Sequence, residues 1–154
     1  AGECMGEALP ELRDIMHKIK ESYDVSKENV GVGSTIFAVK PGDGSAREQA
    51  ASCQKVLGGW ANIANEYATK RYRSNLINWG MLPFIVDKGE LPFANGDYIF
   101  IPQITEAVKN KATSMKAYVV NKDMKEFTLK MDELTDDERQ IILDGCLINY
   151  YRNN

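Results

Sequence analysis

Ser45 and Arg47 are the side chains of this sequence best suited to bind and act on an anion. They directly follow a glycine-rich turn at residues 41–44, and the alanine-rich stretch after them favours a helix. The first N–H groups of a helix have no partners within the helix, and the helix dipole places partial positive charge there. Arg47 would add a planar guanidinium that suits a carboxylate or a phosphate. The pattern therefore predicts an anion-binding turn with a serine hydroxyl beside the anion.

The same residues permit a plainer interpretation. Ser45, followed three residues later by Glu48, is a capping box, in which each side chain bonds the other residue's backbone N–H. Arg47 would then simply point into water. The turn is neither a Walker loop nor a dinucleotide motif, because no Gly-Lys-Ser/Thr follows the glycines and G-x-G-x-x-G is absent. The pattern alone leaves the anion-binding and the capping interpretations open.

The histidine and the cysteines indicate little chemistry of their own. His17, the one histidine of the sequence, lies in a predicted helix without triad-like partners, so we expect it at the surface or at the boundary of the core, without a catalytic role. Cys4, Cys53 and Cys146 match no ligand spacing of zinc or iron–sulfur sites, and Cys53 is expected to be packed in a helix. Three scattered cysteines favour reduced thiols, and therefore a cytoplasmic protein without metal ligands of its own.

A small basic and aromatic cluster is the feature that could meet nucleic acid. It consists of Lys70, Arg71 and Arg73 with Tyr67 and Tyr72. The pattern favours a solvated helix face over a nucleic-acid site. The net charge of −3 argues against a dedicated nucleic-acid binder. No apolar run is long enough for a transmembrane helix, so no membrane partner is expected.

Alternating strand and helix signals surround the Ser45 turn. A β-prone run at 35–40 precedes it, and the helix after it should run from Ser45 to about residue 57 and end at Gly58. The next expected elements are a strand at 60–64, a helix at 69–79 closed by Gly80, and an extended segment at 81–86. Upstream, residues 7–21 show the apolar spacing of an amphipathic surface helix.

The second half of the chain is richer in strands. Candidates lie at 98–101, 117–120 and 126–131. A capping box at Thr135 then opens a helix with Ile141 and Ile142 on its apolar face and Gly145 near its end, and Leu147 and Ile148 could extend that face. We expect a single domain over residues 1–154, with a helix and lead-in at 1–30 and a motif-bearing core at 35–152. Since the chain begins with Ala1, we also expect it to be a piece of a longer polypeptide.

Two motifs in the right order resemble the swivelling C-terminal domain of the aconitase family. Residues 42–51, GDGSAREQAA, resemble its G-x-G-S-S/T-R-E-H-A-A signature. Residues 57–59, LGG, and 73–84, RSNLINWGMLPF, are similar to its L-G stretch and its R-x-N-L-x-x-x-G-L-L-P segment. The sequence departs from the first motif at Ala46, where the family often has a second serine or threonine, and at Gln49, where it has histidine. The resemblance extends over residues 35–152.

The resemblance implies an α/β fold, the three-layer β/β/α swivelling domain of the aconitase C-terminus and the isopropylmalate isomerase small subunit. It implies a hydro-lyase that reversibly dehydrates and hydrates a hydroxy-polycarboxylic acid such as citrate or isocitrate. By motif, Ser45 is the catalytic base, and Ser45, Ala46 and Arg47 bind the substrate, Ala46 through its backbone N–H. A [4Fe-4S] cluster on other domains, fused or in a separate subunit, would act as the Lewis acid, so the isolated chain should be inactive.

Two other functions are compatible with the same fold. Ala46 and Gln49 would suit a non-catalytic anion-binding or interaction domain that has lost the chemistry. RNA binding, which the family resemblance also suggests, is disfavoured by the net charge of −3, and residues 70–73 would be its test site.

Overall fold

A computed structural model describes residues 14, 17 and 32–153 of the chain. The helix predicted over residues 7–21 lies outside the described residues, apart from Asp14 and His17, which are helical and exposed. The chain divides into two compact units, which we describe separately. The Ser45 motif lies in the larger unit, which comprises Gly33–Gly89, Gln103–Met115 and Leu129–Asn154.

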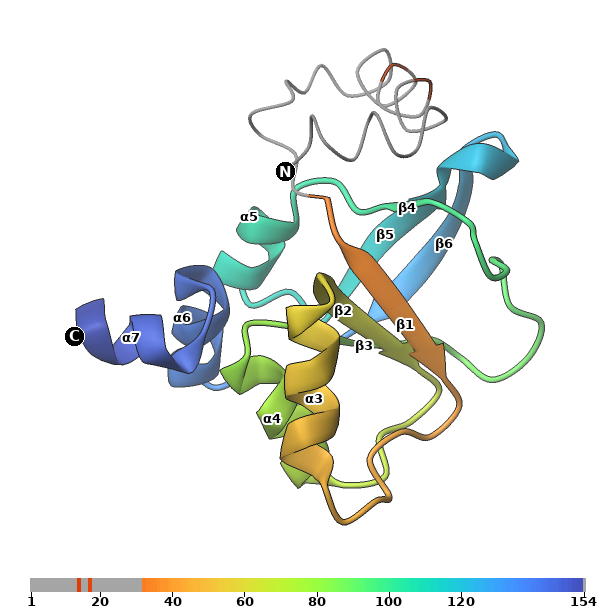
Figure 1. The fold of residues 1–154 in the computed structure, drawn as a ribbon. Coiled ribbons are helices and arrows are strands. Elements are labelled where there is room, and N and C mark those ends of the chain that lie inside the picture. The colour runs from red at the N-terminus through yellow and green to blue at the C-terminus, as the bar shows by residue number, and fades with distance from the viewer. Residues whose placement is uncertain (1–13, 15–16, 18–31, 154) are drawn as a thin grey trace. The chain divides into compact units, whose positions relative to one another are not determined.

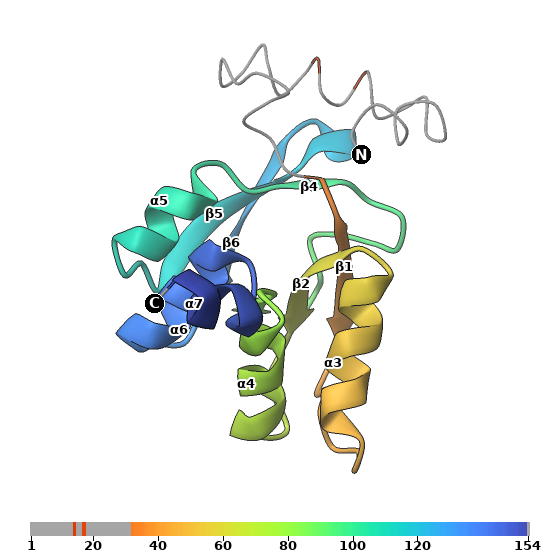
Figure 2. The ribbon, with the colours of Figure 1, turned by 60° about the vertical axis from the view of Figure 1, so that its left-hand side comes forward.

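The larger unit begins with a repeated strand–helix alternation (Figure 1). The elements in chain order are β1 (Ser34–Ala38), α3 (Arg47–Val56), β2 (Gly59–Ala64), α4 (Lys70–Asn78) and β3 (Leu82–Ile85). The pairs β1–β2 and β2–β3 are both parallel, so the two helices are the crossover connections. Helices α3 and α4 run side by side over the same face of these strands (Figures 1 and 2).

The core of this part forms where the two helices meet the strands. Ala51 of α3 and Tyr72 and Leu76 of α4 are buried together with Met81, just before β3. Strand β2 is buried at every position except Trp60, which is typical of a central parallel strand. The helix that follows the Ser45 turn, α3, is therefore packed together with α4 in one buried cluster.

The larger unit continues with three further helices. These are α5 (Ile104–Lys109), α6 (Asp136–Asp144) and α7 (Leu147–Asn153). The predicted capping box of Thr135 is confirmed: its hydroxyl accepts from the Glu138 N–H at 3.1 Å, and the Glu138 carboxylate accepts from the Thr135 N–H at 3.2 Å. The predicted helix end near Gly145 is confirmed, because Gly145 adopts a left-handed φ of 90° and ends α6. The extension of the apolar face of this helix to Leu147 and Ile148 was wrong, since both belong to α7. Ile148 is 73% exposed on the separate helix α7.

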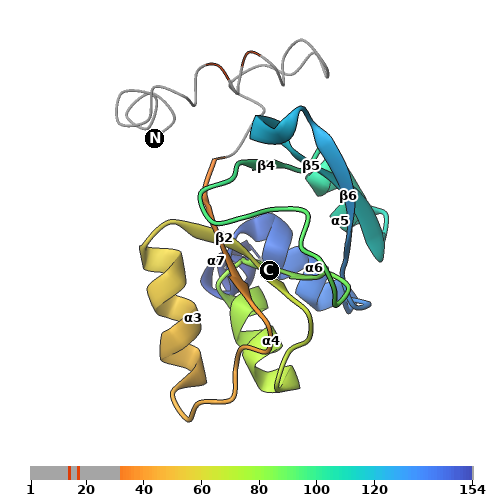
Figure 3. The ribbon, with the colours of Figure 1, turned by 90° about the vertical axis from the view of Figure 1, so that its right-hand side faces the viewer.

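The smaller unit contains Glu90–Pro102 and Lys116–Thr128 among the described residues. Strand β4 (Ile99–Phe100) pairs antiparallel with β5 (Ser114–Val119), which neighbours β6 (Lys125–Lys130) (Figure 3). Val120, in the short 3-10 helix Val120–Lys122, packs with Tyr98, Phe100 and Met124. Lys130, at the end of β6 and already within the larger unit, pairs antiparallel with Ile85 of β3.

The predicted α/β class is confirmed. All six strand or extended segments expected from the sequence overlap strands β1 to β6, and the helices expected around 45–57 and 69–79 correspond to α3 and α4. No helix in the described part of the chain is long and apolar enough to cross a membrane.

Candidate functional site

The loop between β1 and α3 carries Ser45 to the amino end of a helix. Strand β1 ends at Ala38 and α3 begins at Arg47, so Ser45 lies just before the helix. Gly42 bends the loop with a left-handed φ of 98°, which an L side chain rarely adopts. Ser45 and Ala46 are exposed. The turn predicted at residues 41–44 thus presents both to solvent.

The predicted capping box of Ser45 and Glu48 was wrong. The helix starts one residue later than expected, so its N-cap is Ala46, which has no side-chain acceptor and makes no capping hydrogen bond. The first bond of the helix runs from the Ala50 N–H to the Ala46 carbonyl at 3.0 Å. The N–H groups of the first turn therefore lack partners within the helix. By contrast, Thr69 caps α4 with its side chain.

Arg47 stands at the first position of α3 and is half-buried. Its Nε is buried and has no hydrogen-bond partner in the described part of the chain. The ion pairs found among the described residues also leave Arg47 out, although Glu48 follows it directly. A buried donor without an acceptor is uncommon in native proteins. This arginine is available to an anion at the uncapped end of α3.

The loop is held in place by the segment that leads into α4. The Ala68 N–H donates to the Pro41 carbonyl at 2.9 Å. The Thr69 hydroxyl lies 3.5 Å from the Gly42 carbonyl oxygen, and it also accepts from the Tyr72 N–H at 3.1 Å. Two contacts therefore join the loop before Ser45 to the amino end of the neighbouring helix.

Three charged residues lie just beyond the carboxyl ends of β1, β2 and β3. Glu66 pairs with Lys40 at 3.0 Å and with Lys88 at 3.7 Å. The hydrogen bond and charge of Lys40, followed by the charge of Lys88, lower the pKa of the Glu66 carboxyl. We did not predict this group from the sequence, although Lys40 ends one predicted strand, and Glu66 and Lys88 each follow another by two residues. The carboxyl ends of parallel strands form the edge where open α/β sheets bind ligands.

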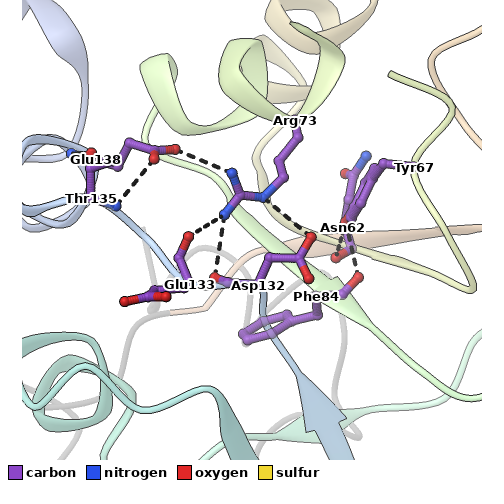
Figure 4. Close-up of polar contacts among 8 residues, drawn as sticks. All are labelled: Asn62, Tyr67, Arg73, Phe84, Asp132, Glu133, Thr135 and Glu138. Carbon is purple, nitrogen blue, oxygen red and sulfur yellow. Dashed lines mark hydrogen bonds and ion pairs between the residues drawn. The ribbon is translucent and has the colours of Figure 1, made fainter. Parts of the chain in front are cut away.

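The basic and aromatic cluster predicted around α4 is not one surface. Arg73 is only 14% exposed, and Glu138 and Asp132 pair with it at 3.4 and 3.9 Å. Its guanidinium also donates to the carbonyl oxygens of Asp132 and Glu133 at 3.3 and 3.2 Å (Figure 4). Lys70 and Arg71 are exposed, whereas Tyr72 is buried. Arg73 therefore makes internal contacts. Lys70 and Arg71 are the cations of this cluster that remain exposed to a nucleic acid.

Tyr67 belongs to the same internal layer. Its hydroxyl donates to the carbonyl oxygens of Asn62 and Phe84 at 3.2 and 3.0 Å and so bridges β2 and β3 (Figure 4). Burial, and to a lesser degree the neighbouring Tyr72, raises the pKa of Tyr67 well above its ordinary value. Tyr67 thus stays protonated and serves as a structural donor.

The described cysteines, Cys53 and Cys146, lie outside the Ser45 turn and are free thiols. Cys53 is exposed on the outer face of α3, so the expectation that it is packed was wrong, and Cys146 is half-buried. Cys4 lies outside the described residues. Among the described residues there is no group of three His, Cys, Asp or Glu side chains that could hold a metal ion. These residues do not fit an iron–sulfur cluster.

Comparison with known proteins identifies the family. The model of the aconitase C-terminal domain matches residues 14–89. A crystal structure of 3-isopropylmalate dehydratase from Methanocaldococcus jannaschii matches with a TM-score of 0.58 and 31% identity, covering 88% of this chain and 71% of that chain. The chain belongs to the aconitase C-terminal domain family. The predicted family and its fold type are thereby confirmed.

Two curated relatives in this family are longer than the chain. Aconitate hydratase A of Rickettsia bellii is 30% identical over 97% of the chain, which spans 17% of that protein. The methanogen homoaconitase small subunit of Methanocaldococcus jannaschii is 33% identical over 72% of the chain, which spans 56% of it. This aconitase C-terminal domain is therefore related both to part of a long hydratase and to a separate small subunit.

Proposed function

We propose that this domain supplies the base and a carboxylate-binding arginine to a hydro-lyase acting on a hydroxy-polycarboxylic acid such as citrate or isocitrate. The observation that carries the proposal is the arrangement of Ser45, Ala46 and Arg47 at the uncapped start of α3. Ser45 is exposed, and the Arg47 Nε is buried without a partner in the described part of the chain. The same three residues occupy the family's motif.

A substrate carboxylate would bind between the Arg47 guanidinium and the free N–H groups at the start of α3. A guanidinium and a helix amino end each favour a carboxylate, and together they fix its direction. Ala46 lacks the hydroxyl that many family members have there, but its backbone N–H remains available. Arg47 beside the positive end of the helix dipole is unfavourable without an anion, and a bound carboxylate relieves that repulsion.

Ser45 would act as the base in the dehydration. As an alkoxide, its Oγ takes a proton from the carbon next to a carboxylate, the electrons of that C–H bond form the double bond, and the hydroxyl on the neighbouring carbon leaves. A proton from the rest of the enzyme converts that hydroxyl to water. A serine hydroxyl is a weak base at its ordinary pKa, and the positive field of the helix end and Arg47 stabilises the alkoxide.

The proposal assigns the remaining chemistry to other domains. A [4Fe-4S] cluster held by a fused or separate partner would supply the Lewis acid. This chain would supply the base and the arginine that binds a substrate carboxylate. We also propose a cytoplasmic enzyme, on the basis of the scattered reduced cysteines.

The decisive experiment replaces Ser45 in the enzyme assembled with its cluster-bearing domains. Ser45→Ala should lower kcat for cis-aconitate hydration by about 1,000-fold or more, because the base is lost. Arg47→Lys should mainly raise KM, because lysine cannot form the two-bond contact. Ser52→Ala on the same helix is the matched control, since the Ser52 hydroxyl bonds only the local Gln49 carbonyl at 3.1 Å. Undiminished turnover in Ser45→Ala would defeat the catalytic assignment.

Ala46 and Gln49 give the non-catalytic alternative its support. Citrate titration of the 154-residue chain, followed by NMR, tests anion binding by itself. Shifts of the Ser45–Glu48 amides with no kinetic effect of Ser45→Ala would establish an anion-binding domain instead of a catalytic one. Replacing citrate with isopropylmalate in the same titration compares the two hydroxy-acid classes.

A further inference from the structure

Tyr72 contacts the loop that leads to Ser45. It lies on α4 and is 2% exposed. A Cβ added at Gly42 would lie 2.5 Å from the Tyr72 Cβ and 2.6 Å from its Cγ, so the Gly42 backbone rests directly on this side chain. Ser45 follows Gly42 by three residues. The position of Tyr72 therefore sets where the loop can pass.

The backbone of Tyr72 is tied to the same loop by Thr69. The Thr69 hydroxyl accepts from the Tyr72 N–H at 3.1 Å and lies 3.5 Å from the Gly42 carbonyl oxygen. A helix cap and a loop contact thus share one hydroxyl group. A shift of Tyr72 would therefore also shift Thr69 and the Gly42 backbone.

The hydroxyl of Tyr72 reaches the helix that carries Arg47. It accepts from the Gln54 Nε2 at 2.9 Å and from the Asn62 Nδ2 at 3.1 Å. Gln54 lies two turns after Arg47 on the same face of α3, and Ala51 between them is fully buried and belongs to the same core cluster as Tyr72. The Tyr72 hydroxyl therefore links α4 to the face of α3 that carries Arg47.

The two amides that hold this hydroxyl are not what apolar packing alone would favour. Asn62 is 2% exposed on β2, between the buried Ala61 and Ile63. Its Oδ1 and the Gln54 Oε1 are buried without hydrogen-bond partners among the described residues. Unpaired buried acceptors are unfavourable, and native structures keep few of them. Two unpaired amide oxygens therefore lie on the same two side chains whose N–H groups donate to the Tyr72 hydroxyl.

We infer that Tyr72, held by Gln54 and Asn62, is a positioning residue that orients Ser45 and Arg47 for the anion. The inference rests on the proposed function for the identity of the ligand. The link between the Tyr72 hydroxyl and the positions of Ser45 and Arg47 does not depend on that function, and it can be tested in the ligand-free chain.

Tyr72→Phe tests the inference because it keeps the ring and removes the hydroxyl. In the ligand-free chain, the amide resonances of Ala46 and Arg47 should shift. Citrate affinity should fall by about threefold to tenfold, the amount associated with one lost hydrogen bond. In the assembled enzyme, kcat for cis-aconitate hydration should fall more than KM rises, because Ser45 is displaced.

Tyr67→Phe is the matched control. It also removes a hydroxyl from the buried layer, one that donates to the carbonyl oxygens of Asn62 and Phe84. It should lower the melting temperature as Tyr72→Phe does, but leave the Ala46 and Arg47 resonances in place. A merely structural role for Tyr72 predicts the same behaviour in both variants.

Gln54→Met supplies an independent variant from the α3 side. It should shift the same resonances, and the double variant with Tyr72→Phe should shift them no further than Tyr72→Phe alone. A folded Tyr72→Phe chain with unchanged Ala46 and Arg47 resonances and unchanged citrate affinity would overturn the inference. If citrate does not bind to the wild-type chain, the proposed function is wrong. The Ala46 and Arg47 resonances of the ligand-free Tyr72→Phe chain would still test the link between Tyr72 and the start of α3.

Discussion

Two arginines in this domain illustrate how the surroundings of a residue decide its use. Arg47 and Arg73 both lie near helix starts and both occur in the family motifs. The Nε of neither arginine has a hydrogen-bond partner among the described residues. Arg73 is nevertheless enclosed by two carboxylates and two carbonyl oxygens, whereas no ion pair of Arg47 is found in the described part of the chain. The sequence shows the same residue type in both places. Only the structure assigns one to stability and leaves the other available for a ligand.

The first prediction concerns Arg73. Arg73→Gln should lower the free energy of unfolding by about 1–3 kcal/mol, because it leaves Glu138 and the Asp132 carbonyl oxygen without their charged partner. Arg71→Gln, two residues earlier on the exposed face of α4, should change it by less than about 0.5 kcal/mol. Urea unfolding followed by circular dichroism measures both. Equal effects of the two variants would contradict the assignment of Arg73 to internal contacts.

The Asp97 carboxylate makes the stability of the fold depend on pH in the acid range. The Asp97 carboxylate accepts from the Ala94 N–H at 2.7 Å, and Asn121 and Lys122 also bond it. These contacts, the Ala94 N–H first, lower the pKa of Asp97 from its ordinary 3.8 to about 2. A lowered carboxyl pKa stabilises the folded state above about pH 3.8, and that stability is lost as the pH falls through about 2. Asp97→Asn should therefore flatten the decline of the melting temperature over this range. An unchanged acid profile would exclude Asp97 as its source.

Among the helices and strands, the sequence predicted best the features that depend on residues close together in the chain. Thr135 caps α6 as the spacing to Glu138 predicted. The helix predicted from residue 69 begins one residue later, with Thr69 as its N-cap. The cap of α3 was misplaced, because the loop geometry from Gly42 to Ser45 delays the helix start to Arg47. Helix α5 was missed because it has six residues and follows Gln103, whose left-handed φ of 54° no pattern indicates. The contacts of Tyr72 and Arg73 join distant segments, which periodicity cannot reveal.

The contact between the ends of α4 and α6 gives a prediction of its own. Gly80 and Gly145 terminate these helices, and a Cβ added at Gly80, whose φ is 72°, would collide with the Gly145 carbonyl oxygen. Gly80→Ala should therefore destabilise the domain by about 3 kcal/mol or more, from the clash together with the strained φ. Gly58 ends α3 with a φ of 87° and open space at its Cβ position. Gly58→Ala should cost only about 1 kcal/mol, from its left-handed backbone. Similar losses in the two variants would show that the helix ends are not in close contact.

At the scale of the whole molecule, the proposed base, the proposed carboxylate-binding arginine and the residues that hold their loop all come from the larger unit. Ser45, Arg47, Thr69 and Tyr72 lie within Gly33–Gly89. This segment also falls in the region matched by the aconitase C-terminal domain model, residues 14–89. The proposed substrate-binding half of the site can therefore form in this chain, while the chain spans 17% of the length of one hydratase relative. Binding and turnover should consequently be separable properties.

The last prediction uses that separation. The 154-residue chain should bind citrate but show no hydration of cis-aconitate, and adding the cluster-bearing domains should restore turnover. The Ser45→Ala chain should fail to restore it, yet compete with the wild-type chain for the same partner, because the substitution leaves the fold unchanged at an exposed position. Competition is measured as inhibition of the restored activity by increasing amounts of Ser45→Ala chain, with Ser52→Ala as the active control. Turnover by the purified chain alone would contradict the division of the site between domains, and a Ser45→Ala chain that restores full activity would remove Ser45 from the mechanism.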